Sequence, residues 1–251
     1  MKEKVSSIMI AFALLATSSF PAYANGNIPN MTSQQQSVDV KVEIVDSPST
    51  EDQDWPIIGT EQYQQTNQFT GKVEIISIIV RQGPPKVGKG ACRGDLNNAD
   101  KVISVAATCV LNAVSVTRSS SEPAGGVTGF AKNYADRYCG GSDCTYYKLK
   151  KLEIWWTRSS SGWIVRSART SWGCSGSCAV CPNNTSYSYL FRSGYFAPSW
   201  SGNGTSTYRY TSTGWPIMKS TDFGTVVGGN DSTVESPTHT TQPLSVYANF
   251  E

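Results

Sequence analysis

The sequence predicts an all-β protein, an antiparallel sandwich or barrel-like body with long loops that is stapled by disulfides. Three observations predict this class. Apolar and polar residues alternate over many short segments, as in half-buried strands. Turn-forming residues separate these segments at short intervals. Seven cysteines follow an export signal in a chain of 251 residues, and exported chains commonly use cystines as staples. No fixed-period repeat is present, which disfavours a propeller or a solenoid.

Residues 1–24 have the features of a secretory signal peptide. Lys2 and Lys4 give a basic start, an unbroken apolar run covers residues 8–16, and Ala22-Tyr23-Ala24 matches a cleavage site. A buried N-terminal helix is the competing interpretation. The apolar run is too short to cross a bilayer, which takes about 20 residues, and no later segment reaches that length. We therefore expect bacterial export to the extracellular space and no transmembrane span.

Residues 25–68 form an acidic arm, with seven acidic residues and one lysine. Strict alternation over residues 37–45 predicts one strand, because Val38, Val40, Val42 and Ile44 fall on one face. Residues 47–67 have the composition of a linker or long loop. The remaining chain, 69–251, holds 18 basic and 11 acidic residues and is predicted to be a basic, aromatic-rich β domain. An acidic arm beside a basic body favours an arm that screens the body, or a pro-segment that is removed.

The first half of the body contains less regular strands. Residues 69–81 predict a central strand, ended by Gly83-Pro84-Pro85. Residues 101–118 predict two strands or one bent strand, with a helix over residues 98–112 as the rival. Residues 119–129 are rich in Ser, Pro and Gly and predict a loop. Residues 131–138 suggest one or two helical turns.

Residues 145–171 form the clearest unit, a predicted β-hairpin around the four-residue loop 159–162. Lys150, Leu152, Ile154 and Trp156 fall on one face of its first strand. Shorter alternating segments then predict four further strands, at residues 187–192, 205–211, 225–227 and 244–250.

The cysteines are predicted to form disulfides. The segment SWGCSGSCAVC has the spacing C-x3-C-x2-C, which is also compatible with an iron–sulfur cluster or with zinc, but an exported protein meets oxidising conditions. Seven cysteines allow three bridges and one unpaired thiol, in a pattern that the sequence does not fix. Local spacing favours pairing Cys139 with Cys144 and Cys92 with Cys109. The candidates are Cys92, Cys109, Cys139, Cys144, Cys174, Cys178 and Cys181.

The sequence gives little support to catalysis. His239 is the sole histidine and lies in a Ser/Thr/Pro-rich stretch, which disfavours histidine-based nucleophilic systems and histidine metal sites. Among the carboxylates, Glu153 is the most site-like, since it lies between Lys151 and Trp155 on an aromatic strand. The competing interpretation for Glu153 is a cross-strand ion pair. We expect no metal and no cofactor, and we leave the enzyme question open while favouring a protein without catalysis.

Aromatic residues interleaved with polar ones in the second half favour a binding function. Flat rings offer apolar contact area with few rotamers to freeze, and they stack on sugars. The competing interpretation is a tryptophan-rich core. We expect a secreted, non-catalytic protein that binds a glycan or an anionic cell-surface polymer, with a carboxylate-dependent glycan hydrolase and a toxin-like effector with an acidic pro-segment as alternatives. Nucleic acid is disfavoured, because no Lys/Arg-rich run is present. The candidate ligand-binding residues are Trp155, Trp163, Trp200, Trp215, Tyr208, Tyr210, Arg158, Arg166 and Arg169.

Overall fold

The computed structural model describes residues 34–36, 38–66, 73–88, 109–121, 124–140, 143–177, 186–219 and 225–250. These residues form strands, turns and irregular segments, with no helix among them. The predicted all-β class with antiparallel sheets is confirmed. The predicted signal peptide and Cys92, Cys178 and Cys181 lie outside the described residues. Within the described part, no helix is long and apolar enough to cross a membrane.

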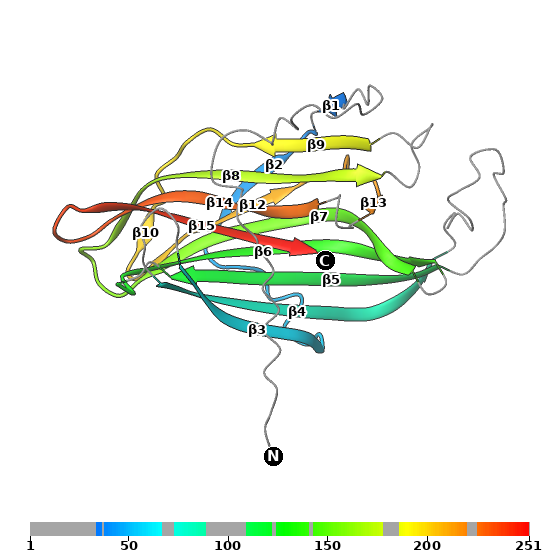
Figure 1. Cartoon of the computed structure of the whole chain (residues 1–251), viewed down its shortest axis with the longest axis horizontal. Coiled ribbons are helices and arrows are strands. Elements are labelled where there is room, and N and C mark those ends of the chain that lie inside the picture. Colours follow the sequence, from blue (N-terminus) through cyan, green and yellow to red (C-terminus); the bar gives the residue numbers. More distant parts are fainter. Residues whose placement is uncertain are drawn as a thin grey trace, which may run out of the picture. The chain divides into compact units, whose positions relative to one another are not determined.

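The larger of two sheets is built around five long strands in the order β3-β4-β5-β6-β7 (Figure 1). Three short strands, β11, β12 and β13, line the far edge of β7, and β12 in turn pairs with β2 while β11 pairs with β10. The strands of this sheet are β2 (Lys41–Val45), β3 (Ile57–Thr66), β4 (Val73–Gly88), β5 (Cys109–Ser121), β6 (Val127–Gly140), β7 (Asp143–Arg158), β10 (Trp200–Ser201), β11 (Gly204–Thr205), β12 (Thr207–Thr211) and β13 (Met218–Lys219).

The smaller sheet has the strand order β1-β9-β8-β14-β15. β1 pairs with β9 in parallel and the other neighbours are antiparallel. Its strands are β1 (Gln34–Gln36), β8 (Ile164–Ser177), β9 (Ser186–Arg192), β14 (Thr225–Glu235) and β15 (Thr241–Phe250).

One hydrophobic core lies between the two sheets. Strand alternation places Leu152, Ile154 and Trp156 of β7 on the inner face of the large sheet, where each is fully buried. Trp172 of β8 faces them from the small sheet, and its indole N–H donates to Asn133 Oδ1 of β6 at 3.2 Å. The indole of Trp156 likewise donates to a serine hydroxyl on β14 at 3.1 Å. These bonds satisfy the polar tips of large buried rings and link the sheets.

The predicted hairpin over residues 145–171 is wrong, although both of its strands exist. β7 and β8 belong to different sheets and do not pair with each other. The apolar faces of both strands point into the core from opposite sides, so the loop 159–163 must carry the chain from one sheet to the other. Gly126 allows this crossing because a Cβ there would lie 2.0 Å from the ring of Trp163.

Three further segments differ from the prediction. Residues 131–138 are part of β6 and not helical turns, because the segment is paired on both sides, with β5 and with β7. Gly83-Pro84-Pro85 does not end β4, which continues to Gly88 across an irregularity between Gln82 and Pro85. Residues 47–67 were expected to form a linker or long loop; residues 47–56 are such a loop, whereas Ile57–Thr66 form β3, paired with β4.

Of the seven cysteines predicted to form disulfides, the structure describes the side chain of one, Cys174. Cys174 lies on β8 in the core with 3% of its surface exposed, and it is a free thiol. The backbones of Cys139 and Cys144 flank the Gly140–Asp143 pair that joins β6 to β7. The side chains of those two residues and of Cys109 fall outside the described part, so disulfide stapling stays a prediction.

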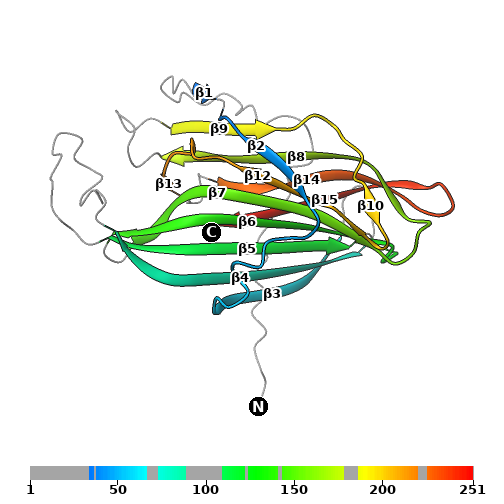
Figure 2. The same cartoon turned by 180° about the vertical axis from the view of Figure 1, so that it is seen from behind.

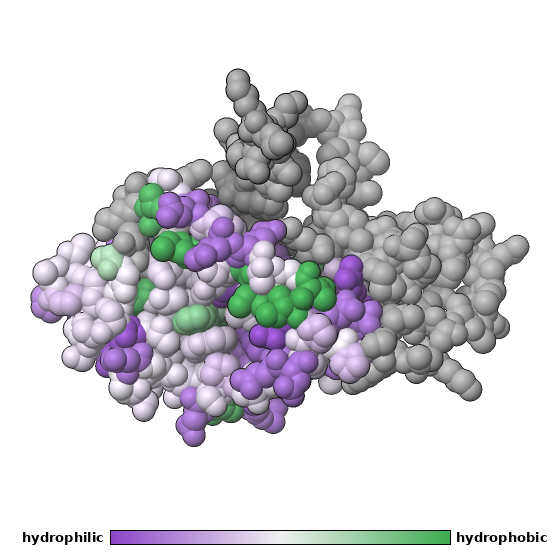
Figure 3. Space-filling model, turned by 90° about the horizontal axis from the view of Figure 1, so that it is seen from below, coloured by the Kyte–Doolittle hydropathy of each residue, from purple (hydrophilic) through white to green (hydrophobic). Residues whose placement is uncertain are grey.

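Apolar side chains are exposed at both edges of the large sheet. Val42 and Ile44 of β2 are 47% and 64% exposed at one edge. At the opposite edge, Ile57 of β3 and Val73 and Ile75 of β4 are each about half exposed. Figure 3 looks at the molecule from the side on which β3 lies in Figure 1, and hydrophobic groups stand among hydrophilic ones there. Val73 and Ile75 alternate with the buried Ile76, so they lie on the outer face of the sheet, away from the core. Val42 and Ile44 instead lie on the inner face, opposite Tyr210 and Tyr208, at an edge that the core leaves exposed.

Candidate functional site

The outer face of the large sheet, turned away from the core, carries a row of polar and aromatic side chains. Alternation places Phe130, Lys132 and Tyr134 of β6 on this face. Lys151, Glu153 and Trp155 of β7 lie opposite them, in the pairs Phe130–Trp155, Lys132–Glu153 and Tyr134–Lys151. Arg209 of β12 lies opposite Glu153 and extends the pair Lys132–Glu153 across a third strand. The row therefore runs from a pair of aromatic rings to a cluster of charges.

Residues 46–56, which we call the strap, cross this face. The strap leaves β2 at one edge of the large sheet and enters β3 at the other (Figure 2). It passes over β7, β6 and β5, and its side chains and backbone contact the charged row beneath it. The sequence prediction that the acidic arm screens the basic body stays a proposal for the whole arm, but in the strap acidic side chains do lie against basic ones.

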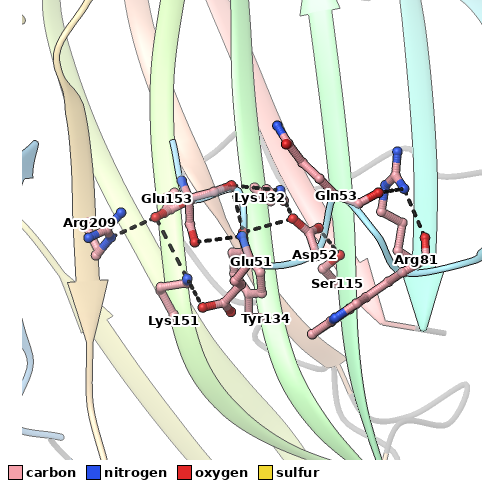
Figure 4. A network of polar contacts seen from close by, with 12 residues as sticks. Glu51, Asp52, Gln53, Arg81, Ser115, Lys132, Tyr134, Lys151, Glu153 and Arg209 are labelled. Carbon is pink, nitrogen blue, oxygen red and sulfur yellow. Dashed lines mark hydrogen bonds and ion pairs between the residues drawn. The ribbon is translucent and has the colours of Figure 1, made fainter. Parts of the chain in front are cut away.

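Asp52 is the central contact of the strap (Figure 4). Its carboxylate is fully buried, pairs with the ammonium group of Lys132, and accepts a hydrogen bond of 2.5 Å from Ser115. The hydroxyl of Tyr134 donates to the same carboxylate at 3.4 Å. Burial raises the pKa of Asp52, but the bonds from Lys132 and Ser115 outweigh it, so the pKa lies below its usual value. Asp52 is therefore charged at neutral pH and holds the strap on the sheet.

Glu153, the carboxylate that the sequence analysis selected, is fully buried beneath the strap. Its Oε1 accepts a bond of 2.7 Å from Arg209 Nε, and its Oε2 accepts one of 2.9 Å from the backbone N–H of Ser49. Lys151 Nζ lies 4.0 Å from Oε1. The arrangement is the cross-strand ion pair that was the competing interpretation. Both oxygens of Glu153 therefore hold contacts within the protein.

Further contacts fasten the strap on either side of Asp52. Glu51 pairs with Lys151 at 3.0 Å, with half of the Glu51 side chain exposed. Beyond Asp52, Arg81 of β4 donates from Nη1 to the carbonyl oxygens of Gln53 and Trp55, at 3.1 and 3.0 Å. The ring of Trp55 lies flat on Gly83, where a Cβ would come within 2.9 Å of it.

The aromatic end of the row lies beside the strap. The rings of Phe130 and Trp155 stack with centroids 4.9 Å apart and planes within 1° of parallel. Both side chains are partly exposed. Trp155 was predicted as a ligand-binding residue, and the structure brings it next to Phe130 and two residues along β7 from Glu153.

The other predicted binding residues are divided between the interior and two distant surfaces. Trp215, Tyr208 and Tyr210 are buried in the core, where Trp215 meets the ring of Trp172 and the hydroxyl of Tyr210 accepts a bond from Thr170. These three rings are not part of the outer face.

Arg158, Trp163 and Trp200 meet at the end of β7. The guanidinium of Arg158 lies 4.3 Å from the ring centroid of Trp200 and donates to the carbonyl oxygens of Gly202, Ser161 and Trp163. Arg158 thus ties together the loops that leave the large sheet, and its donors are already engaged.

The last two predicted residues lie on β8 of the small sheet. Arg166 forms a bidentate pair with Glu235, whose Oε1 also accepts a hydrogen bond of 2.7 Å from the Nδ1–H of His239. The bonds from Arg166 and His239 lower the pKa of Glu235 to about 2. The guanidinium of Arg169 lies 5.4 Å from the ring centroid of Tyr195, which is 72% exposed.

Four residues of the outer face were not predicted from the sequence: Phe130, Lys132, Tyr134 and Arg209. Lys132 and Tyr134 were hidden because residues 131–138 were assigned to helical turns, in which positions i and i+2 do not share a face, and Phe130 lies just before that segment. Reading the segment as a strand puts all three on one side at period two, the same signal that selected β7. Arg209 lies in a strand that was predicted, and its own alternation with Thr211 and Thr207 is the signal that places it on the outer face.

No protein-family model matches the chain, and neither does any curated protein or solved structure. Among the residues that the structure describes, no group of three or more His, Cys, Asp or Glu side chains is placed to hold a metal ion. The outer face of the large sheet is therefore assigned as the candidate site on its geometry alone.

Proposed function

We propose that the protein is an exported binding protein whose outer sheet face binds a glycan that carries carboxylate groups. The observation that carries the proposal is the stacked pair Phe130–Trp155 at the end of a row of cations, Lys132, Lys151 and Arg209. A partly exposed ring pair is a platform for the apolar face of a sugar. Cations a few residues further along the same face attract acid groups on the same polymer.

The charges of this face favour an acidic ligand over a neutral one. Four cations, Arg81, Lys132, Lys151 and Arg209, lie on the face with two acids, Glu153 and Glu43. Glu43 is also paired with Lys41 of its own strand. Guanidinium and ammonium groups bind carboxylates through charge-assisted hydrogen bonds, which are stronger than neutral ones. Glu153 orients Arg209 and does not cancel the excess of positive charge.

The glycan hydrolase alternative is less well supported by the same geometry. Its candidate acid, Glu153, is enclosed by Arg209 and by the backbone of Ser49, with no open oxygen toward solvent. A glycosidase needs two carboxyl groups flanking a bound sugar. The face offers a surface for binding, and we favour a function without catalysis.

The test is binding of polygalacturonate, a carboxylated glycan, to the exported protein by isothermal titration calorimetry. The Trp155→Ala variant should bind about 10 to 30 times more weakly, because an anchoring ring contributes roughly 1.4 to 2 kcal/mol to an interface. Tyr195→Ala is the matched control, since Tyr195 is an exposed aromatic outside the outer face of the large sheet. Equal affinities of the wild type and Trp155→Ala would reject the site.

A further inference from the structure

The strap places carboxylates of the chain itself on the cations that the proposed ligand would use. Asp52 pairs with Lys132 and Glu51 pairs with Lys151. Ser49 adds its carbonyl oxygen, which accepts from Lys132 at 3.3 Å, and its N–H, which donates to Glu153. Figure 4 shows the strap residues and the sheet residues pointing toward one another along the row. The contacts have the chemistry of a bound acidic ligand.

We propose that the strap is a built-in occupant of the binding face, and that a carboxylated glycan displaces it to reach Lys132 and Lys151. This inference rests on the function proposed above and adds a regulation to it. The ligand first meets the ring pair Phe130–Trp155, which the strap leaves partly exposed, and then replaces Glu51 and Asp52 on the cations.

The strap has enough length to rise while both of its ends stay paired. β2 and β3 are separated by six strand spacings in the order β2-β12-β7-β6-β5-β4-β3, a span of roughly 30 Å at about 4.8 Å per spacing. The twelve steps from Val45 to Ile57 reach about 40 Å when extended, at about 3.3 Å each. The difference lets the middle of the strap lift off the sheet by on the order of 10 Å without unpairing β2 or β3.

The strap is held mainly by polar contacts, which an acidic ligand can replace. Glu51, Gln53 and Asp54 are exposed. Trp55 is the main apolar contact, and it lies toward the β3 end, away from Lys151. The pair Glu51–Lys151 is half exposed and therefore weak. Opening thus exchanges one set of carboxylate contacts for another, with little apolar surface to expose.

The test compares Asp52→Asn with Asp54→Asn in binding of polygalacturonate. Asp52→Asn removes the main contact of the strap, so the open state is more populated and the apparent affinity should rise about tenfold. Asp54→Asn removes one charge from the same segment without touching the charged row, and it should bind like the wild type. Circular dichroism checks that each variant is folded. If Asp52→Asn fails to fold, Glu51→Gln replaces it as the test variant, because the Glu51 side chain is half exposed. The apparent affinity of Glu51→Gln for polygalacturonate should rise about threefold.

Hydrogen–deuterium exchange reports on the strap independently of affinity. Saturating polygalacturonate should speed exchange in the peptide 46–56 of the wild type by at least tenfold, because the Ser49 N–H loses its bond to Glu153. Unchanged exchange at saturation would overturn the inference.

The outcomes separate the two proposals. If the wild type and Asp52→Asn bind equally and both lose affinity with Trp155→Ala, the function stands and the strap is not an occupant. If neither the wild type nor Asp52→Asn binds polygalacturonate, the proposed function is rejected, and the proposed regulation is rejected with it. Poly-aspartate serves as a carboxylated polymer without sugars, and equal binding of it would overturn the assignment to a glycan. Tighter binding by Asp52→Asn, lost again in Asp52→Asn/Trp155→Ala, supports both.

Discussion

The contact between Asp52 and Lys132 should be strongly coupled, and a double-mutant cycle measures the coupling. The two side chains are 1% and 11% exposed, so removing one partner leaves a poorly hydrated charge. Breaking a buried pair in this way costs about 3 kcal/mol, which corresponds to a fall in Tm of roughly 6 to 12 °C in a unit of this size. Asp52→Asn and Lys132→Met should each show a loss of this order, reduced to the extent that the strap lifts and hydrates the remaining charge.

The double variant Asp52→Asn/Lys132→Met should lose about 2 kcal/mol less than the sum of the single variants, because neither charge is then left alone. Urea unfolding followed by tryptophan fluorescence gives the free energies of unfolding. The pair Lys150–Asp136 is the matched control, at 3.3 Å with the lysine 53% exposed, and its cycle should give less than about 1 kcal/mol. Equal coupling in the two cycles would refute the view that Asp52 is the main contact of the strap.

Three further predictions concern pH, the buried thiol and the core. Because the pKa of Asp52 is lowered in the folded state, its stabilisation is present above the unfolded pKa of about 3.9 and is lost as pH falls through the folded value. Pepsin should therefore cut increasingly within residues 46–56 as the pH falls from about 4 to about 2, and a strap that stays uncut over this whole range would contradict the prediction. Burial raises the pKa of the Cys174 thiol to about 12, so iodoacetamide at pH 8 should leave Cys174 unmodified until urea unfolds the protein, and labelling of the native protein at the rate of a free peptide thiol would place Cys174 outside the core. Trp215→Ala should lower the free energy of unfolding, measured with urea, by about 3 to 5 kcal/mol. Its affinity for polygalacturonate, measured by calorimetry, should stay within twofold of the wild type. Loss of affinity with unchanged stability would instead show that Trp215 is a binding residue.

The strands with regular alternation were predictable because alternation is a local property. The row Leu152, Ile154 and Trp156 gave β7 from the sequence alone, and burial of all three confirms the face. Residues 131–138 were not predictable in the same way. Ala131 and Ala135 are four residues apart, as on one face of a helix, and alanine favours helix. Pairing with β5 and β7 overrides that preference, and no local pattern contains that information.

The candidate site was predictable only in part, because its contacts join distant segments. Asp52 and Lys132 are 80 residues apart, and no spacing rule connects a carboxylate in a polar loop with a lysine in a strand. The sequence did select Trp155 and Glu153, whose neighbours on β7 signal a partly polar sheet face. The sequence also pointed to Trp215, because the residue type alone does not show whether a tryptophan is buried or exposed. Separating them takes the register of whole sheets.

The crossing of the strap over the large sheet also determines the order in which segments of the chain can fold. Val45 at the end of β2 pairs with Thr207 of β12, so β2 finds its partner only when nearly the whole chain is present. The surface on which Asp52 rests is made by β5 and β6, which come later in the chain than the strap itself. Contacts between such distant segments form slowly, because closing long loops costs entropy before the contact repays it. Residues 41–56 are therefore translated before the strands that receive them and become ordered after those strands, so in refolding the central strands should gain protection first and this early segment last.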